Sequence, residues 1–174
     1  CMKCHYCINN HHTACETLHK TNFDPGGFSE YLRVPKINVE IGTFKLPNEI
    51  SFEKGTFIEP IGTVVRAQRI ANLKKEQTLL VVGSGISGLM HIKVAKSKNV
   101  HKIIAVDINE YTVNAAKRFG ADLTINAKDD VVSRIKSFNE NRLADIVVVC
   151  TGALNAAQQA LKCIDKGGTI LFFA

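Results

Sequence analysis

The second half of the chain alternates between short apolar runs and amphipathic stretches. The runs are continuous and rich in β-branched residues, as in strands buried on both faces, at 78–82, 102–106, 123–126, 145–150 and 169–173. Helical spacing of apolar residues occurs between them, at 86–96, 109–119, 129–139 and 155–164. Gly120 is expected to end the second helix, and Gly167-Gly168 the last. This alternation predicts an α/β fold with a doubly wound parallel sheet.

The first part of the chain lacks this alternation. Residues 1–22 are polar and rich in cysteine and histidine, so they are expected to form a loop-dominated lobe that needs a metal ion. Residues 24–27 (DPGG) predict a turn, and 28–35 (FSEYLRVP) an alternating strand ended by Pro35. Residues 36–58 are expected to form short irregular pieces.

A helix is expected from Pro60, which is tolerated in a first helical turn, through Ala71. We therefore predict two domains. The first spans 1–58 and contains the lobe 1–22, and the second, 59–174, carries the doubly wound sheet.

Composition and charge exclude several classes of function. The 45% hydrophobic and 22% charged content is ordinary for a globular protein, and no apolar run is long enough to cross a membrane. The chain begins without Met or a signal-peptide pattern, so a truncated start and a cytoplasmic location are expected. The formal charge of +6 falls to about +4 if four thiolates bind Zn²⁺. Basic and aromatic residues are not interleaved, which argues against nucleic-acid binding.

Four cysteines cluster at the start of the chain with the spacing C-x2-C-x2-C-x7-C. Four thiolates around Zn²⁺ form a closed tetrahedral site, which is structural. The alternatives are an iron–sulfur cluster, whose fourth cysteine usually follows after three residues, and a site in which a histidine replaces one thiolate. The zinc ligands predicted by the spacing are Cys1, Cys4, Cys7 and Cys15, and the histidines available for replacement are His5, His11 and His12. Cys150 and Cys163 lie in apolar context and are expected in the core, in a reducing compartment.

A glycine-rich turn follows the first predicted strand of the sheet. The sequence is Gly83-Ser84-Gly85-Ile86-Ser87-Gly88, and it opens a predicted helix. In this pattern the first glycine permits the tight turn, the second lets the backbone approach a pyrophosphate, and the third allows close packing of helix and strand. The helix N-terminus then offers backbone N–H groups to the phosphates. The turn therefore predicts a dinucleotide site.

An acidic residue follows at the end of the next predicted strand. Asp107 closes the segment IIAVD, close to the spacing expected for a ribose ligand. Its carboxylate would accept hydrogen bonds from the adenine-ribose hydroxyls and repel a 2′-phosphate. Ile108 and Asn109 follow it in place of the Arg that favours NADP, so NAD is the predicted cofactor.

These motifs resemble the medium-chain, zinc-dependent alcohol/polyol dehydrogenases, which include alcohol, sorbitol and threonine dehydrogenases. The resemblance covers nearly the whole chain and rests on the cysteine lobe, DPGGFSEYLRVP, Glu59-Pro60, VVGSGISG, IAVD and VVVCTGA. It implies a GroES-like catalytic domain beside a Rossmann domain. It also implies hydride transfer between an alcohol or polyol CH–OH group and NAD, with a catalytic zinc as Lewis acid.

The resemblance also implies roles for individual residues. Glu59 matches a catalytic-zinc ligand, Thr63 a position beside the nicotinamide, and Thr151 and Gly152 a loop near the adenosine half. Relatives form dimers or tetramers, so a homo-oligomer is expected. Met2 and Asn10 stand where glycines are common in the family, which matters only if those positions require a positive φ.

The chain also departs from the family pattern. The upstream Cys and His ligands of the catalytic zinc have no counterpart in it, and it stops before the last Rossmann strand. We therefore expect residues 1–174 alone to be inactive on alcohols. The alternative is a non-catalytic, zinc-stabilised NAD-binding module.

Overall fold

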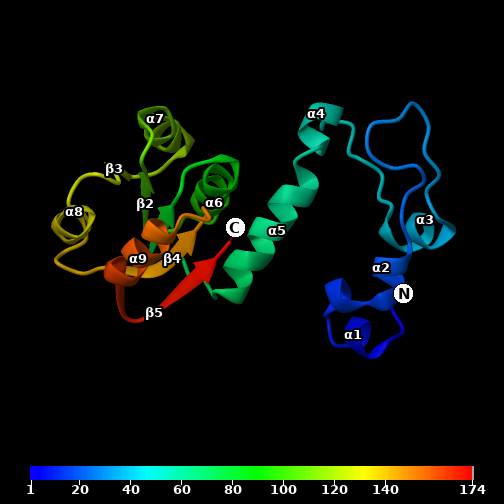
Figure 1. Cartoon of the computed structure of the whole chain (residues 1–174), viewed down its shortest axis with the longest axis horizontal. Helices are drawn as coiled ribbons and strands as arrows, with labels where there is room; N and C mark the ends of the chain where they lie inside the picture. Colours follow the sequence, from blue (N-terminus) through cyan, green and yellow to red (C-terminus); the bar gives the residue numbers. More distant parts are fainter. Residues whose placement is uncertain (174) are drawn as a thin grey trace. The chain divides into compact units, whose positions relative to one another are not determined.

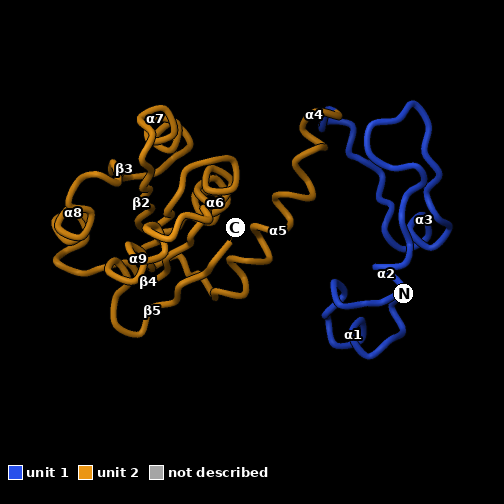
Figure 2. Tube along the Cα trace, viewed as in Figure 1, with its two compact units in different colours: residues 1–51 blue, residues 52–174 orange. Residues whose placement is uncertain are grey.

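The computed structural model describes residues 1–173, which form two compact units, one of residues 1–51 and one that begins at residue 52 (Figure 2). The helices of the first unit are short: α1 His5–Ile8, the 3-10 turn η1 His12–Ala14, α2 Glu16–Lys20 and α3 Lys36–Gly42. None of the helices in the described part combines the length and the apolar composition that a membrane span requires. The GroES-like origin of the first unit and a domain boundary after residue 58 stay predictions.

The second unit is a parallel sheet with helices on both faces (Figure 1). Its strands are β1 Thr78–Val82, β2 Lys102–Asp107, β3 Leu123–Asn126, β4 Ala144–Val149 and β5 Ile164–Phe172. Its helices are α4 Phe52–Gly55, α5 Ile58–Ile70, α6 Ile86–Ser97, α7 Glu110–Phe119, α8 Val131–Phe138 and α9 Leu154–Cys163. The strand order is β3-β2-β1-β4-β5, and all pairs are parallel. This confirms the predicted doubly wound α/β fold.

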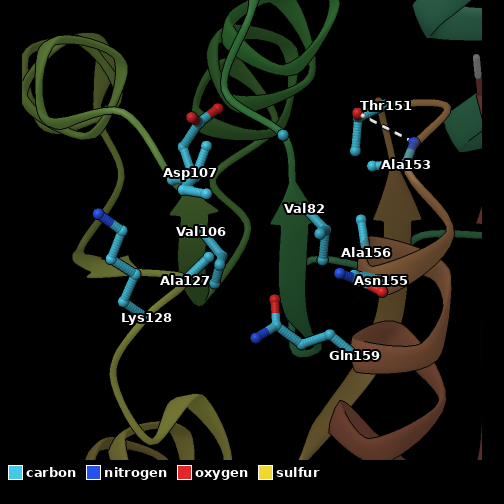
Figure 3. A pocket seen from close by; sticks show the side chains of 12 residues that line it. Val82, Val106, Asp107, Ala127, Lys128, Thr151, Ala153, Asn155, Ala156 and Gln159 are labelled. Atoms are coloured by element: carbon cyan, nitrogen blue, oxygen red, sulfur yellow. Dashed lines mark hydrogen bonds between the residues drawn. The ribbon is translucent and has the colours of Figure 1, made fainter.

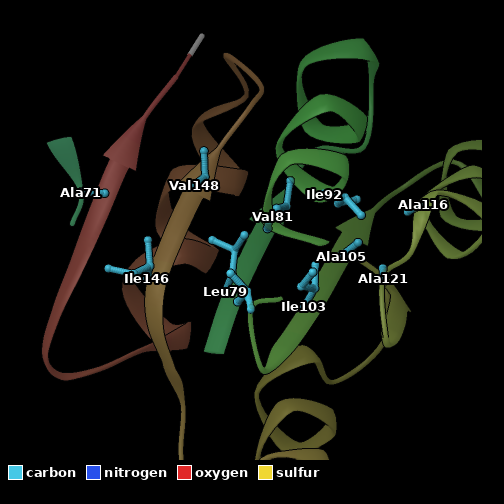
Figure 4. Packing of buried hydrophobic residues seen from close by; sticks show 12 residues of the cluster. Ala71, Leu79, Val81, Ile92, Ile103, Ala105, Ala116, Ala121, Ile146 and Val148 are labelled. Carbon is cyan, nitrogen blue, oxygen red and sulfur yellow. The ribbon is translucent and has the colours of Figure 1, made fainter. Parts of the chain in front are cut away.

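Alternate residues of each central strand enter two separate cores. Leu79 and Val81 of β1 face one layer, together with Ile92 of α6 and Ala116 of α7 (Figure 4). The next residue on either side of Val81 points the other way, into a core closed by α8 and α9. A strand buried on both faces has no polar positions, which is why the apolar runs in the sequence are continuous.

Local capping fixes the helix boundaries near the first two strands. The side chain of Asn109 accepts a 2.8 Å hydrogen bond from the Tyr111 N–H at the start of α7. Gly120, with φ of 112°, ends the same helix in the left-handed conformation that glycine adopts without strain. The end of the helix agrees with the prediction, and its start lies one residue later than predicted, because Asn109 is the N-cap.

Two predictions for the first unit were wrong. Residues 28–35 form no strand; the extended chain makes only an isolated bridge between Asp24 and Arg33. A strand needs a neighbour for its backbone groups, and none of the described residues of this unit supplies one. Residues 36–42 form the helix α3 in place of irregular structure, with Pro35 as its N-cap.

The glycine pair near the end of the chain was also misassigned. Helix α9 ends at Cys163, and Gly167 and Gly168 lie inside the span of β5, at a register shift opposite Asp145. A Cβ on Gly168 would come within 2.8 Å of the Asp145 carbonyl oxygen. The pair therefore permits a close backbone approach within the sheet edge and does not end the helix.

The packing of α5 on α6 contains a buried polar contact. The side-chain amide of Gln68 donates a 2.9 Å hydrogen bond to the His91 carbonyl oxygen, and Lys98 donates to the Gln68 side-chain oxygen at 3.2 Å. The His91 ring is fully buried against Phe173, and its Nε2 has no partner among the described residues. Burial, and then the charge of Lys98, lower the pKa of His91 to about 4.

We expect this histidine to make the fold acid-sensitive. Between pH 6.5 and about 4 the unfolded chain takes up a proton that the folded chain excludes, so the free energy of unfolding falls by up to about 3 kcal/mol. Urea denaturation followed by circular dichroism at pH 7 and pH 4.5 measures the loss. The His91→Gln variant should lose about 2 kcal/mol less than the wild type over this range. Equal pH dependence of the two proteins would contradict the assignment.

Candidate cofactor and metal sites

Steric contacts differ at the three glycines of the glycine-rich turn. Gly83 has φ of 93°, and a Cβ there would approach the Cys150 carbonyl oxygen to 3.0 Å. A Cβ on Gly88 would lie 2.0 Å from the Gly83 carbonyl oxygen, so α6 packs directly on the turn. Gly85 caps α6, and a Cβ there would meet nothing within 4 Å. The turn is therefore closed on its inner side and open where a phosphate would approach.

A cleft of about 310 Å³ opens beside this turn, at the carboxyl ends of the strands (Figure 3). Asp107 lies at the tip of β2, and Thr151 follows the tip of β4. Most of the wall between them is apolar. The lining residues are Val82, Gly83, Val106, Asp107, Ile108, Ala127, Lys128, Thr151, Ala153, Asn155, Ala156 and Gln159. This is the place where open α/β sheets bind ligands.

The cleft includes polar residues that sequence reasoning missed. Asn155 and Gln159 lie four residues apart on α9, and Lys128 follows β3. The spacing of the α9 pair was the available signal, because positions i and i+4 of a helix share a face. That the face is turned toward Asp107 depends on the crossover from β4, which local pattern does not show.

The predicted cofactor residues fall into three groups. Three of them line the cleft: Gly83, Asp107 and Thr151. Six others lie beside the cleft. Gly152 is exposed just after Thr151, and the other five form the turn and the start of α6: Ser84, Gly85, Ile86, Ser87 and Gly88. Thr63 is not among the lining residues; it lies on α5, where its hydroxyl donates a 2.7 Å hydrogen bond to the Pro60 carbonyl oxygen. Its role stays a prediction.

Glu59 is exposed in the first turn of α5. Among residues 1–173, the cysteine cluster is the one group of three or more potential ligands close enough to share a metal ion. Among the described residues Glu59 is therefore not part of a cluster of three or more potential ligands, and its assignment to a catalytic zinc also stays a prediction.

The four clustered cysteines come together around one point. Their sulfur atoms all lie within 4.8 Å of one another, with Cys1 and Cys15 at 3.5 Å and Cys1 and Cys7 at 3.9 Å. Zn–S bonds of 2.3 Å in a tetrahedron place sulfurs about 3.8 Å apart. The cysteines are free thiols, and the histidines of the lobe are not in the group. The donor set therefore fits a tetrahedral thiophilic metal ion.

Backbone N–H groups stabilise the thiolate form of one of these cysteines. The N–H of Leu18, at the start of α2, is the main cause that lowers the pKa of Cys15 to about 6. Removal from water acts in the opposite direction and raises the pKa of Cys7. A bound cation would favour the thiolate form of all four. The remaining two cysteines behave differently: burial raises the pKa of Cys150 to about 12 and that of Cys163 to about 11, as suits inert core thiols.

The cysteine lobe contains two residues in left-handed backbone conformation. Met2 has φ of 60° and Asn10 φ of 62°. These are the two positions where the family resemblance implies glycine, so the condition for a conformational cost is met. Asparagine tolerates this region, whereas methionine is strained by roughly 1 kcal/mol or more.

We therefore expect Met2→Gly to stabilise the lobe by about 1 kcal/mol, and Asn10→Gly to change its stability less. The measurement is the chelator concentration that releases half of the metal from each variant. A midpoint for Met2→Gly equal to or below that of the wild type would show that Met2 is not strained.

Comparison with known proteins agrees with this geometry. The model of the family described as zinc-binding dehydrogenase matches residues 87–174. The chain is 30% identical to the uncharacterized zinc-type alcohol dehydrogenase-like protein YdjJ of Escherichia coli, covering 98% of the chain and 49% of that protein. It is 32% identical to an L-threonine 3-dehydrogenase of Symbiobacterium thermophilum, with 98% and 48% covered.

Solved structures give the same result. The alcohol dehydrogenase TADH from Thermus sp. ATN1 superposes with a TM-score of 0.85 at 27% identity, over 99% of this chain and 51% of that one. The chain spans about half the length of the curated relatives it matches. With a family match over half of its residues, the chain belongs to the zinc-binding dehydrogenases, as its motifs indicated.

Proposed function

We propose that the protein is a zinc-dependent oxidoreductase that transfers hydride between an alcohol or polyol CH–OH group and NAD. The observation that carries this proposal is the position of the glycine-rich turn and Asp107, side by side at the mouth of one cleft. Residues 1–174 then supply most of the nucleotide site and one zinc site of the enzyme. The family match and the threonine and alcohol dehydrogenases among the relatives support the reaction class.

Different residues in and beside the cleft would bind different parts of the nucleotide. The first N–H groups of α6 have no partners within the helix and would be available to a pyrophosphate, and the space beside its N-cap Gly85 is open. Asp107 would accept hydrogen bonds from the adenine ribose, and the apolar wall near Thr151 would cover the adenine. Bound NAD supplies the nicotinamide carbon that exchanges hydride with the substrate.

The cysteine cluster is proposed to hold a structural zinc ion. Four sulfur ligands leave no open coordination position, so such a site stabilises the lobe and does not bind substrate. Glu59 and Thr63 are proposed to act in the complete enzyme, as a ligand of a separate catalytic zinc and as a neighbour of the nicotinamide. A homo-oligomer and a cytoplasmic location belong to the same proposal; the free cysteines suit a reducing compartment.

One observation favours a second candidate, a non-catalytic NAD-binding module. The described residues form the cleft beside the glycine-rich turn and one cluster of potential metal ligands, and Glu59 is not a member of that cluster. If this candidate holds, the longer protein that contains this chain will bind NAD and zinc and still turn over no alcohol.

Calorimetric titration of the 174-residue chain with NAD⁺ and with NADP⁺ tests the cofactor assignment. We expect binding of NAD⁺ and at least about tenfold weaker binding of NADP⁺, because a 2′-phosphate meets the Asp107 carboxylate. The absence of NAD⁺ binding, or a preference for NADP⁺, would contradict the proposed function. Titration of an Asp129→Asn variant is the control for nonspecific charge effects, because Asp129 lies outside the lining of this cleft.

A further inference from the structure

Both carboxylate oxygens of Asp107 are engaged by the protein's own backbone. One oxygen, Oδ2, accepts a 2.6 Å hydrogen bond from the Ser84 N–H in the glycine-rich turn. The other, Oδ1, accepts a 2.9 Å hydrogen bond from the Asn109 N–H, at the start of the next helix. The side chain that faces the cleft therefore also joins the turn after β1 to the segment after β2.

The turn has a second attachment to the same strand end. The N–H of Gly83 donates a 2.8 Å hydrogen bond to the Val106 carbonyl oxygen, so two successive N–H groups of the turn are bonded to successive residues of β2. The first bond continues the pattern of the sheet, whereas the second depends on a side chain. Ser84 itself is fully buried, so its N–H could not turn to water if the carboxylate were lost.

We propose that Asp107 is a positioning residue that holds the glycine-rich turn in its phosphate-binding shape before any nucleotide arrives. The functional meaning of this inference rests on the proposed nucleotide site. The same two hydrogen bonds also fix the orientation of the Asp107 side chain, because its carboxylate cannot rotate away from the cleft without breaking both. A fixed carboxylate excludes a 2′-phosphate more strongly than a mobile one, so the bonds also determine the preference for NAD.

The chemistry of a carboxylate suits both tasks at once. An ionised carboxylate offers about four lone-pair sites, and the backbone N–H groups occupy one on each oxygen. One site per oxygen remains, which matches the two adjacent hydroxyls of an adenine ribose. Asparagine has nearly the same shape, but its NH₂ group would face an N–H donor, so it cannot satisfy both backbone groups.

Hydrogen exchange measured by NMR on the chain without nucleotide tests the positioning role. In Asp107→Asn we expect the Ser84 or the Asn109 amide to exchange about tenfold faster or more, because one charge-assisted hydrogen bond is lost. Asp122→Asn is the matched control: Asp122 accepts a 2.8 Å bond from the Ile103 N–H of the same sheet, away from the turn. Its exchange at Ser84 should equal that of the wild type.

Unchanged exchange at both amides in Asp107→Asn would overturn the inference, whatever the nucleotide affinities are. If this variant is too unstable for the measurement, Asp107→Glu gives the same comparison, because its extra methylene displaces both oxygens while keeping the charge. A second set of titrations then compares NAD⁺ with NADP⁺. The dissociation constant of NADP⁺ divided by that of NAD⁺ should fall about tenfold or more in Asp107→Asn. If the wild type binds neither nucleotide, the proposed function fails while the exchange result still decides the positioning role.

Discussion

Removal of the metal by a strong chelator is expected to unfold residues 1–22 and to leave the sheet of the second unit intact. The lobe holds two buried cysteines, Cys7 and Cys15, and otherwise almost no apolar core of its own. In such lobes the free energy of zinc binding, about 10–16 kcal/mol, is the free energy of folding. The second unit has its own two cores and should not respond.

Two-dimensional NMR separates the two units in one experiment. Signals from the lobe should collapse to unfolded positions on chelation, while those of β1, β2 and β4 stay in place. Cys7→Ser should give the same spectrum without chelator, and His11→Ala, which removes a ring outside the sulfur cluster, should leave the metal bound. A lobe that keeps its dispersed signals without metal would show that zinc does not hold it.

Among glycine-to-alanine substitutions in the second unit, Gly88→Ala is expected to cause the largest loss of stability. The added carbon would lie 2.0 Å from the Gly83 carbonyl oxygen and 3.2 Å from Val81, so α6 must move away from the turn. Overpacking of this kind costs about 3 kcal/mol, and the displaced helix N-terminus should no longer hold a pyrophosphate. Thermal unfolding and NAD⁺ titration measure the two losses.

Two other glycine variants separate stability from binding. Gly85→Ala adds a methyl group to open space at an ordinary φ of −68°, so stability should stay near that of the wild type while NAD⁺ affinity falls at least about tenfold. Gly62→Ala, at an exposed position of α5, should stabilise the helix slightly and leave binding unchanged. A Gly88→Ala protein with wild-type stability would contradict the packing described for the turn.

Secondary structure was predicted correctly where it depends on neighbouring residues in the sequence, and incorrectly where it depends on contacts between distant segments. β1 was predicted residue for residue, because its five residues are buried on both faces of the sheet and form a short, almost entirely apolar run. The bounds of β3 were also predicted correctly, although only Ile125 of that strand is fully buried. The strand predicted at 28–35 was wrong. Phe28 and Tyr31 are exposed, so the alternation of apolar and polar residues in this segment does not correspond to a face packed against other described residues. Gly167-Gly168 misled because a glycine pair after a helix and one at a sheet irregularity look alike in sequence.

The candidate sites divide in the same way. The spacing of Cys1, Cys4, Cys7 and Cys15 is local, and the structure brings their sulfur atoms together as predicted. The glycine turn and Asp107 follow from a repeating strand–helix pattern and also lie together. The α9 wall of the cleft, and the bond from the Ser84 N–H to Asp107, arise from the way strands separated in sequence meet, which no local motif encodes.

The metal content of the purified 174-residue chain, measured by plasma mass spectrometry with a visible absorption scan of the same sample, tests the central claim most directly. The account predicts one zinc ion per chain and no visible band, because four thiolates form one closed site and the described residues contain no second cluster of three or more potential ligands. Iron with visible absorption would replace the zinc assignment by an iron–sulfur cluster. Two zinc ions per chain would contradict the assignment of a single, structural site.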